Sequence, residues 1–388
     1  MRWLHCAACG LQIYFENSLC SACGAALGFV PERQAMATLQ GDSGTLPIDA
    51  GSWVPCANRR PNEVCNWLVH VNDGSPFCLS CRLTSTIPPL DDAANLGRWA
   101  AIERAKRRLV FTTLSLGLSL RPKLGSDDRD GLEFRWLAPA AGAPVVTGHH
   151  DGVITLDITE ADDDHREAAR VSLGESSRTV LGHLRHELGH HLHQRFVAGT
   201  PIEDEVRAHF GDERQDYDAA LRTHYEQGPP PGWEQQHISA YASAHPWEDW
   251  AETCAHYLLM IDAVETAQAW GLAFNDSAAE PLQAEPFIGP PDAITELVLN
   301  RWLPAARLLN AMSRSLGQRD SYPFLIAAPV LDKLRCVRRV LLGAAASAVA
   351  KAQCAVGTAS SCAPLPCNAP PSNSQVDTAS GGIALSAL

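Results

Sequence analysis

Two histidines four residues apart, His186 and His190, enclose Glu187 and constrain this chain more than any other feature. In an α-helix, residues four apart share one face and lie about 6 Å apart along the axis, so both imidazoles can reach one metal ion. Glu187 then points about 100° away from His186. This spacing is the HExxH pattern, in which two histidines hold zinc and the carboxylate faces a zinc-bound water.

The flanking residues favour a helix that packs on a core. Four leucines fall at helical spacing and predict one apolar stripe, namely Leu181, Leu184, Leu188 and Leu192. Four histidines fall on roughly the opposite face, namely His183, His186, His190 and His193. We therefore predict a metal-bearing helix beside a cleft, in preference to a chance HExxH on a solvated helix. His183 and His193 are expected to line the cleft or meet solvent.

A catalytic zinc site needs a third protein ligand and one open position. No third histidine follows at metzincin spacing, and the better candidates lie in a second predicted helix that begins at Pro246. Its Glu248-Asp249-Trp250-Ala251-Glu252 segment resembles the ExxA(D/E) element of gluzincin peptidases. The resemblance implies that Glu248 is the third ligand and that Glu252 orients a ligating histidine. Glu252 as the ligand is the alternative.

Three further side chains near this helix have candidate roles. Tyr241 or His245 could stabilise an oxyanion formed beside the metal, although packing or surface roles suit both residues as well. Cys254 falls on the apolar face of its helix and is expected to be a buried free thiol.

The N-terminal segment contains two sets of four cysteines. The first set forms two CxxCG knuckles and comprises Cys6, Cys9, Cys20 and Cys23. The second set comprises Cys56, Cys65, Cys78 and Cys81. Four thiolates close a tetrahedral site and leave no open position, so we predict two structural zinc ions. Disulfides are the alternative, but they require an oxidising compartment, and no signal peptide precedes Cys6.

Charge limits the partners of this segment. The chain has a net charge of −13, and residues 1–90 contain five arginines, six acidic residues and no lysine. Nucleic acid is bound mainly through basic residues that neutralise phosphates. We therefore expect no nucleic-acid partner. The longest apolar run near the end, residues 340–350, is too short to span a bilayer, so no membrane association is expected.

Composition and periodicity divide the chain into three parts. They are a Cys-rich segment at 1–90, a main domain at 93–350, and a Ser/Ala/Pro-rich tail at 351–388 that is expected to be disordered. Helices are predicted at 93–116, 160–172, 203–227, 292–316 and 328–350, besides the two helices above. Strands are predicted at 132–137 and 153–158. The second strand could pair with an extended substrate or be an ordinary sheet strand.

Together these segments resemble a bacterial family. Residues 1–90 are similar to a rubredoxin-like zinc ribbon, through segments such as Cys56-Ala57-Asn58 and Cys81-Arg82-Leu83-Thr84. Residues from about 95 to 340 are similar to the zinc-binding metallopeptidase domain that follows that ribbon, through Gly152-Val153-Ile154-Thr155-Leu156 and the two helices described above. The family's peptidase activity is itself inferred from the motif.

We therefore predict an α+β protein in which small four-cysteine zinc-ribbon modules precede a mainly helical, zincin-like metallopeptidase domain with a small sheet. The predicted function is cytoplasmic, zinc-dependent hydrolysis of peptide bonds, with Glu187 as general base and one catalytic and two structural zinc ions. The substrate is expected to be a peptide or protein, and the ribbon could recruit a protein partner. The alternative is a zinc-ribbon interaction protein whose HExxH site is non-catalytic.

Overall fold

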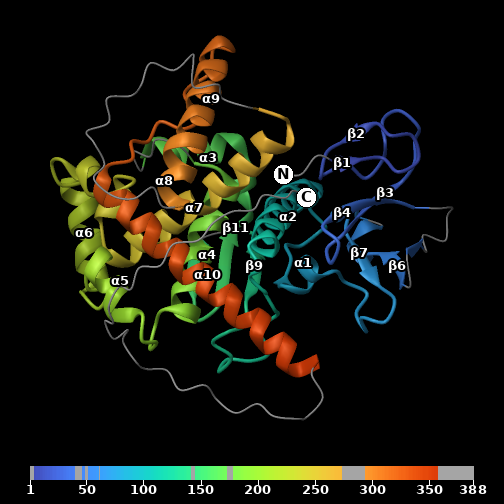
Figure 1. Ribbon diagram of the computed structural model, residues 1–388, viewed down its shortest axis with the longest axis horizontal. Coiled ribbons are helices and arrows are strands. Elements are labelled where there is room, and N and C mark those ends of the chain that lie inside the picture. Colours follow the sequence, from blue (N-terminus) through green and yellow to red (C-terminus); the bar gives the residue numbers. More distant parts are fainter. Residues whose placement is uncertain are drawn as a thin grey trace, which may run out of the picture. The chain divides into compact units, whose positions relative to one another are not determined.

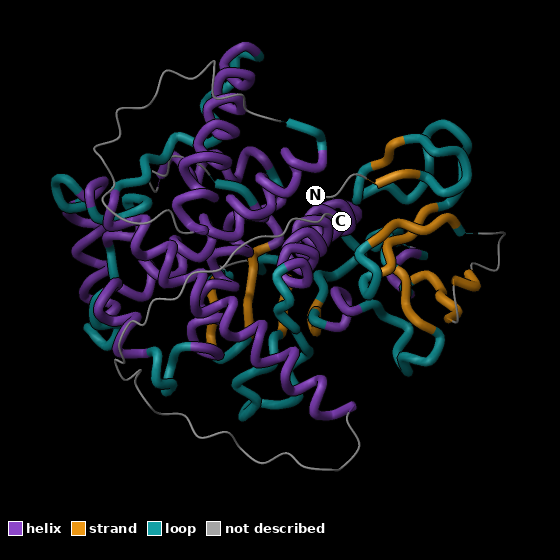
Figure 2. The backbone as a smooth tube through the Cα atoms, in the orientation of Figure 1, coloured by secondary structure: helices purple, strands orange, loops and turns teal. Residues whose placement is uncertain are grey.

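The fold is given by a computed structural model that describes residues 4–39, 46–48, 51–60, 62–140, 145–172, 178–272 and 293–356 (Figures 1 and 2). The described residues up to 348 belong to one compact unit, and residues 349–356 fall outside it. The predicted domain boundary between residues 90 and 93 lies inside that compact unit. Within the described residues, no helix is long and apolar enough to cross a membrane.

The Cys-rich segment consists of short strands joined by tight turns. Its strands are β1 (Leu4–His5), β2 (Gln12–Ile13), β3 (Leu27–Val30), β4 (Ala35–Thr38), β5 (Leu46–Ile48), β6 (Gly51–Pro55) and β7 (Leu68–His70). They pair antiparallel as β1-β2, β3-β4 and β5-β6-β7. Gly10 and Gly24, which follow the two CxxC knuckles, have φ of +74° and +70°. Glycine adopts this conformation without the steric cost that a side chain brings.

A four-stranded sheet has the order β10-β11-β9-β8. Its strands are β8 (Thr84–Thr86), β9 (Glu133–Leu137), β10 (Gly148–His150) and β11 (Val153–Asp157). Strand β11 is parallel to β9 and antiparallel to β10, so it is paired on both edges. The suggestion that the strand at 153–158 pairs with a substrate is therefore wrong, because β11 is an internal strand and β10 is the exposed edge.

The helices account for most of the main domain. They are α1 (Leu79–Arg82), α2 (Ala93–Ser115), α3 (Asp163–Ser172), α4 (Val180–Phe196), α5 (Glu203–Phe210), α6 (Tyr217–Gln227), α7 (Pro246–Ala269), α8 (Ala293–Thr295), α9 (Leu303–Ser315) and α10 (Ala328–Val356). Short segments of other helix types are η1 (Ala57–Arg59), η2 (Ile158–Ala161), η3 (Trp233–Gln235), η4 (Tyr241–Ser243) and η5 (Glu296–Trp302). The predicted helix at 203–227 is two helices, and the predicted tail boundary at 351 falls inside α10. The rest of the predicted disordered tail, residues 357–388, lies outside the described residues.

Helices α4 and α7 pack against each other at the centre of the main domain, with α2 beside α4 (Figure 1). Gly189 is the point of close approach, because a Cβ there would lie 3.0 Å from Ala251 Cα. Trp250 Nε1 donates a hydrogen bond to the Gly189 carbonyl oxygen at 2.9 Å. The tight contact brings the HExxH residues of α4 next to the acidic residues in the first turns of α7.

The zinc-ribbon segment packs directly onto α2. Phe15, Phe29 and Trp67 form an aromatic cluster with Phe111 of α2, with ring centroids 4.9–6.2 Å apart. Polar contacts add to this interface, since the Arg108 side chain of α2 pairs with Glu16 at 2.6 Å. The chain then continues from α1 into β8, so the ribbon supplies one strand of the main sheet.

Candidate metal centre

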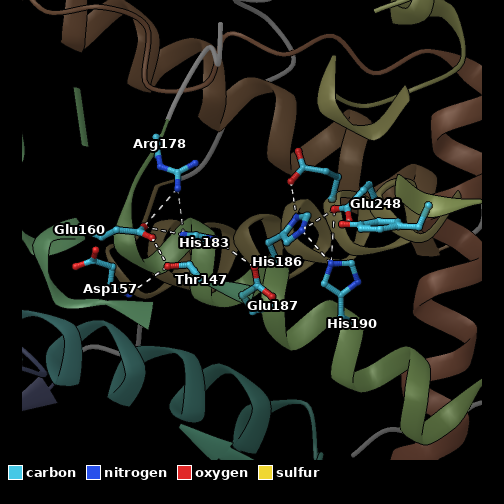
Figure 3. Close-up of polar contacts among 11 residues, drawn as sticks. Thr147, Asp157, Glu160, Arg178, His183, His186, Glu187, His190 and Glu248 are labelled. Carbon is cyan, nitrogen blue, oxygen red and sulfur yellow. Dashed lines mark hydrogen bonds and ion pairs between the residues drawn. The ribbon is translucent and has the colours of Figure 1, made fainter. Parts of the chain in front are cut away.

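Three side chains of α4 and α7 converge on one point. His186 Nε2 lies 3.1 Å from His190 Nε2 and 2.9 Å from Glu248 Oε2. Glu248 Oε2 lies 3.6 Å from His190 Nε2. All three residues are buried. The structure thus brings together the three residues predicted as metal ligands (Figure 3). Glu248, and not Glu252, faces the Nε2 atoms of both histidines.

The geometry of these atoms fits a tetrahedral zinc ion. Zinc with ligands at about 2.0–2.2 Å separates its ligand atoms by about 3.3–3.6 Å. Two of the observed separations are a few tenths of an ångström shorter, and the third falls within the range. Glu248 Oε2 is buried and accepts no hydrogen bond in the described part of the chain. A buried carboxylate oxygen that faces two imidazole nitrogens is well suited to a cation.

The remaining polar atoms of His186 and Glu248 are held in place by neighbouring residues. Glu252 Oε1 lies 2.7 Å from His186 Nδ1, and Ser239 Oγ donates to Glu252 Oε2 at 2.6 Å. Tyr217 donates its hydroxyl proton to Glu248 Oε1 at 2.6 Å. A carboxylate on the far nitrogen of a ligating histidine fixes its tautomer and ring orientation. Glu252 occupies the orienting position that the gluzincin resemblance implied, and Tyr217 is a contact that the sequence did not reveal.

Electrostatics in this cluster favour positive charge. Burial alone would lower the pKa of His186, but the carboxylates of Glu248 and Glu252 reverse the effect and raise that pKa well above its usual range. Burial would raise the pKa of Glu248, but His190 and His186 lower it well below its usual range. A metal ion needs neutral imidazoles and an ionised carboxylate, and it would supply the positive charge in place of protons.

Glu187 lies beside this cluster and contacts His183, one turn earlier on α4 (Figure 3). His183 Nε2 is 3.2 Å from Glu187 Oε1. Burial would raise the pKa of Glu187, but the contact with His183 and the charges of His186 and His190 lower it to about 2. The carboxylate is therefore ionised at neutral pH, as a general base must be.

Aromatic rings pack around His190. Trp247 stacks on its imidazole, with ring centroids 4.9 Å apart and an interplanar angle of 12°. His149 from β10 approaches the same ring at 6.2 Å. These contacts limit rotation of the His190 ring and place the edge strand β10 next to the metal centre.

The two candidate oxyanion stabilisers are in different positions. The Tyr241 ring lies beside His186, with centroids 5.9 Å apart. His245 instead caps the start of α7, where its Nδ1 accepts from Trp247 N at 3.1 Å. Its Nε2 lies 3.3 Å from the Gln215 carbonyl oxygen. Because both ring nitrogens of His245 contact backbone atoms, a capping role fits this residue better than oxyanion stabilisation.

The expectation that His193 lines the cleft or meets solvent is wrong, whereas His183 is partly exposed and contacts Glu187. The His193 ring is 3% exposed and packs edge-on against Trp247 and Trp250. The His183 side chain lies between two carboxylates. Every residue of α4 from 184 to 193 is buried, so the helix has no solvated face in this part. As predicted, Cys254 is a free buried thiol, and burial raises its pKa to about 12.

The first four cysteines gather in one cluster. The Sγ atoms of Cys6 and Cys23 are 3.8 Å apart, and those of Cys9 and Cys20 are 3.6 Å apart. Tetrahedral zinc with thiolates at about 2.3 Å separates sulfur atoms by about 3.8 Å. A disulfide would hold the sulfurs at about 2.0 Å. The spacing therefore fits a zinc site and does not fit disulfides.

The second four cysteines also gather in one cluster, and all four are buried. Cys65 Sγ lies 3.7 Å from Cys78 Sγ. Backbone amides donate to these sulfurs, from Trp67 N to Cys65, from Cys78 N to Cys56 and from Cys81 N to Cys78. Such bonds stabilise thiolates and are consistent with a structural zinc site.

Comparison with known families agrees with this architecture. Residues 95–340 match the family described as "Putative zinc-binding metallo-peptidase". Residues 3–92 match a zinc-ribbon domain. The chain belongs to this family, and a zinc-ribbon domain precedes the family's domain in the chain. The family resemblance and the predicted α+β fold class are confirmed.

Similar proteins occur in mycobacteria. The uncharacterized proteins Mb2598c of Mycobacterium bovis and Rv2568c of Mycobacterium tuberculosis are each 42% identical to this chain over 344 residues. The match covers 88% of this chain and 95% of each relative. No solved structure matches the chain significantly.

Proposed function

We propose that this protein is a zinc-dependent peptidase of gluzincin type. One observation carries the proposal: the carboxylate of Glu187 lies beside the converging side chains of His186, His190 and Glu248 (Figure 3). Zinc, when bound, lowers the pKa of a bound water towards neutrality and polarises a substrate carbonyl. His186, His190 and Glu248 would hold the ion, and Glu252 would keep His186 in the orientation required.

Glu187 has the properties of a general base. Its Oε1 contacts His183, whereas its buried Oε2 has no hydrogen-bond partner in the described ranges of the chain. That oxygen is free to accept a proton from water and later to return it to the leaving amine. Tyr241, beside His186, would stabilise the developing oxyanion.

The two four-cysteine clusters would hold structural zinc, so the proposed content is three zinc ions per chain. Thiols grouped as metal sites suit a reducing compartment, and we propose the cytoplasm on that ground. The substrate would be a peptide or protein, and the ribbon segment would be a docking site for a protein and not for nucleic acid.

Hydrolysis of a broad peptide mixture tests this function without knowledge of the substrate. The purified zinc-loaded protein is incubated with peptides prepared from a whole bacterial proteome, and new termini are identified by mass spectrometry. We expect Glu187→Gln to retain zinc and to lose about 10²–10⁴-fold in rate. Glu234→Gln, an exposed carboxylate, is the matched control. Absence of cleavage by the wild-type protein would favour the non-catalytic scaffold, and unchanged cleavage by Glu187→Gln would remove Glu187 from the mechanism.

A further inference from the structure

His183 joins two carboxylates that come from different elements. Its Nδ1 lies 2.7 Å from Glu160 Oε2 in η2, and its Nε2 lies 3.2 Å from Glu187 Oε1 in α4 (Figure 3). The exposed fractions of the His183, Glu160 and Glu187 side chains are 15%, 5% and 6%. Both ring nitrogens are thus used, and water has little access to either contact.

Glu160 is itself fixed from several sides. Thr147 Oγ1 donates to Glu160 Oε1 at 3.2 Å, and the Arg178 guanidinium lies 3.5 Å from Glu160 Oε2. Thr147 in turn accepts a hydrogen bond from Asp157 N at the end of β11. The network therefore starts in the sheet and ends at Glu187, so the sheet sets the position of the His183 ring.

The hydrogen-bond donors and acceptors of Glu160, His183 and Glu187 determine the charge of this network. A neutral imidazole has one donor and one acceptor nitrogen, whereas an ionised carboxylate only accepts. A ring that faces two carboxylates satisfies both only when each nitrogen bears a proton. His183 would then be an imidazolium that binds Glu187 Oε1 and leaves Glu187 Oε2 as the oxygen available for proton transfer.

We propose that His183 is a positioning residue for Glu187, and that Glu160 orients His183. The proposal deepens the proposed peptidase function and rests on it. His183 fixes which carboxylate oxygen faces the reacting water and prevents Glu187 from rotating away or pairing with a metal ligand. Glu160 acts only through the His183 ring.

Kinetics of designed variants separate positioning from simple packing. The substrate is a peptide found to be cleaved by the wild-type protein in the mixture above. We expect His183→Gln to retain its zinc content, to lose about 10–100-fold in kcat and to change KM little. His193→Gln, which removes another buried ring from α4, measures the effect of lost packing alone.

Coupling between the two residues is the second kinetic test. Because Glu160 acts through His183, adding Glu160→Gln to His183→Gln should lower kcat no further. Additive losses in the double variant, or a His183→Gln enzyme whose kcat falls no more than that of His193→Gln, would overturn the proposal.

A readout without activity distinguishes failure of this proposal from failure of the peptidase function. In protein labelled with ¹⁵N-histidine, NMR should show two slowly exchanging ring N–H protons that disappear in His183→Gln. Two such protons together with no hydrolysis by the wild-type protein would overturn the peptidase function but support the contacts of His183 with Glu160 and Glu187. A His183 ring with only one N–H proton would overturn the proposed role of His183, whether or not the protein hydrolyses peptides.

Discussion

At the scale of single residues, the two carboxylates on one face of α7 have different neighbours. Glu248 Oε2 faces both histidine Nε2 atoms, whereas Glu252 Oε1 lies against Nδ1 of His186, the nitrogen on the far side of that ring. We predict that Glu248→Gln loses the zinc of this centre, because one of three protein ligands is removed. Glu252→Gln should retain the zinc with about 10–100-fold weaker affinity. Competition for zinc with a chelator measures the zinc affinity of both variants. A lower affinity in Glu252→Gln than in Glu248→Gln would make Glu252 the third ligand.

A second residue-scale prediction concerns the buried pair of Glu103 and Lys106, whose Oε1 and Nζ atoms are 2.9 Å apart. Burial would raise the pKa of Glu103, but Lys106 and hydrogen bonds lower it. A lowered folded-state pKa contributes stability above the unfolded pKa of about 4.3, and that stability is lost as the pH falls through the folded value. Glu103→Gln should be about 3–5 kcal/mol less stable at pH 7, because Lys106 stays buried without its partner.

The pH dependence provides the check on this pair. Urea unfolding between pH 7 and pH 3 should show a shallower loss of stability for Glu103→Gln than for the wild-type protein. The double variant Glu103→Gln/Lys106→Met removes the unpaired charge and should recover part of the stability at pH 7. Equal slopes for the wild-type protein and Glu103→Gln would contradict this assignment.

The sequence predicted the ligand set better than it predicted the neighbours. Helical spacing alone placed His186 and His190 together, and the resemblance of residues 248–252 to the gluzincin ExxA(D/E) element added Glu248 to them. Tyr217 and Glu160 could not be predicted, because they reach the site from elements far away in sequence. The i, i+4 spacing of His183 and Glu187 was the one available signal for their contact.

At the scale of elements, Gly189 sets the distance between α4 and α7. A Cβ at this position would approach Ala251 Cα and O at 3.0 Å, and both atoms belong to the backbone. We predict that Gly189→Ala pushes the helices apart, lowers stability by about 1–3 kcal/mol and weakens zinc binding. Urea unfolding and chelator competition measure the two effects.

The control for this prediction is Gly97→Ala in α2, where a Cβ would meet no atom within 4 Å. This change should stabilise the protein by roughly 0.5–1 kcal/mol, because alanine favours a helix over glycine. Wild-type zinc affinity and stability in Gly189→Ala would show that the helices tolerate a wider separation.

Most of the longer helices and two of the strands followed from periodicity, as the bounds of α2, β9 and β11 show. The pairing of strands did not, since β8 comes from the ribbon segment and β10 is only three residues long. Such short strands have no clear alternation, and their partners are determined by tertiary packing. The break between α5 and α6 was also missed, although Gly211, with φ of +97°, marks the end of α5.

At the scale of the whole molecule, the two cysteine clusters differ in how they connect to the main core. Cys6 and Cys20 belong to a small separate apolar cluster, whereas Cys56, Cys65, Cys78 and Cys81 belong to the main core. Just after Cys81, the Leu83 carbonyl oxygen accepts a hydrogen bond from Phe134 N of β9 at 2.7 Å. Loss of the second cluster should therefore disturb the main sheet.

We predict that Cys78→Ser and Cys9→Ser each lose one zinc ion but differ in stability. Cys78→Ser should lower the melting temperature of the whole compact unit, because its cluster supports β8 and α2. Cys9→Ser should change the main transition little. Calorimetry with zinc analysis compares the two variants, and an equal effect on the main transition would show that the second cluster is not part of the core.

The most direct test of the proposed metal centre is the zinc content of the wild-type protein and of the double variant His186→Ala/His190→Ala. We predict three zinc ions per chain in the wild-type protein and two in the variant, with both four-cysteine sites still filled. Equal zinc content in the two proteins would mean that α4 and α7 hold no metal, and it would contradict the proposed peptidase site.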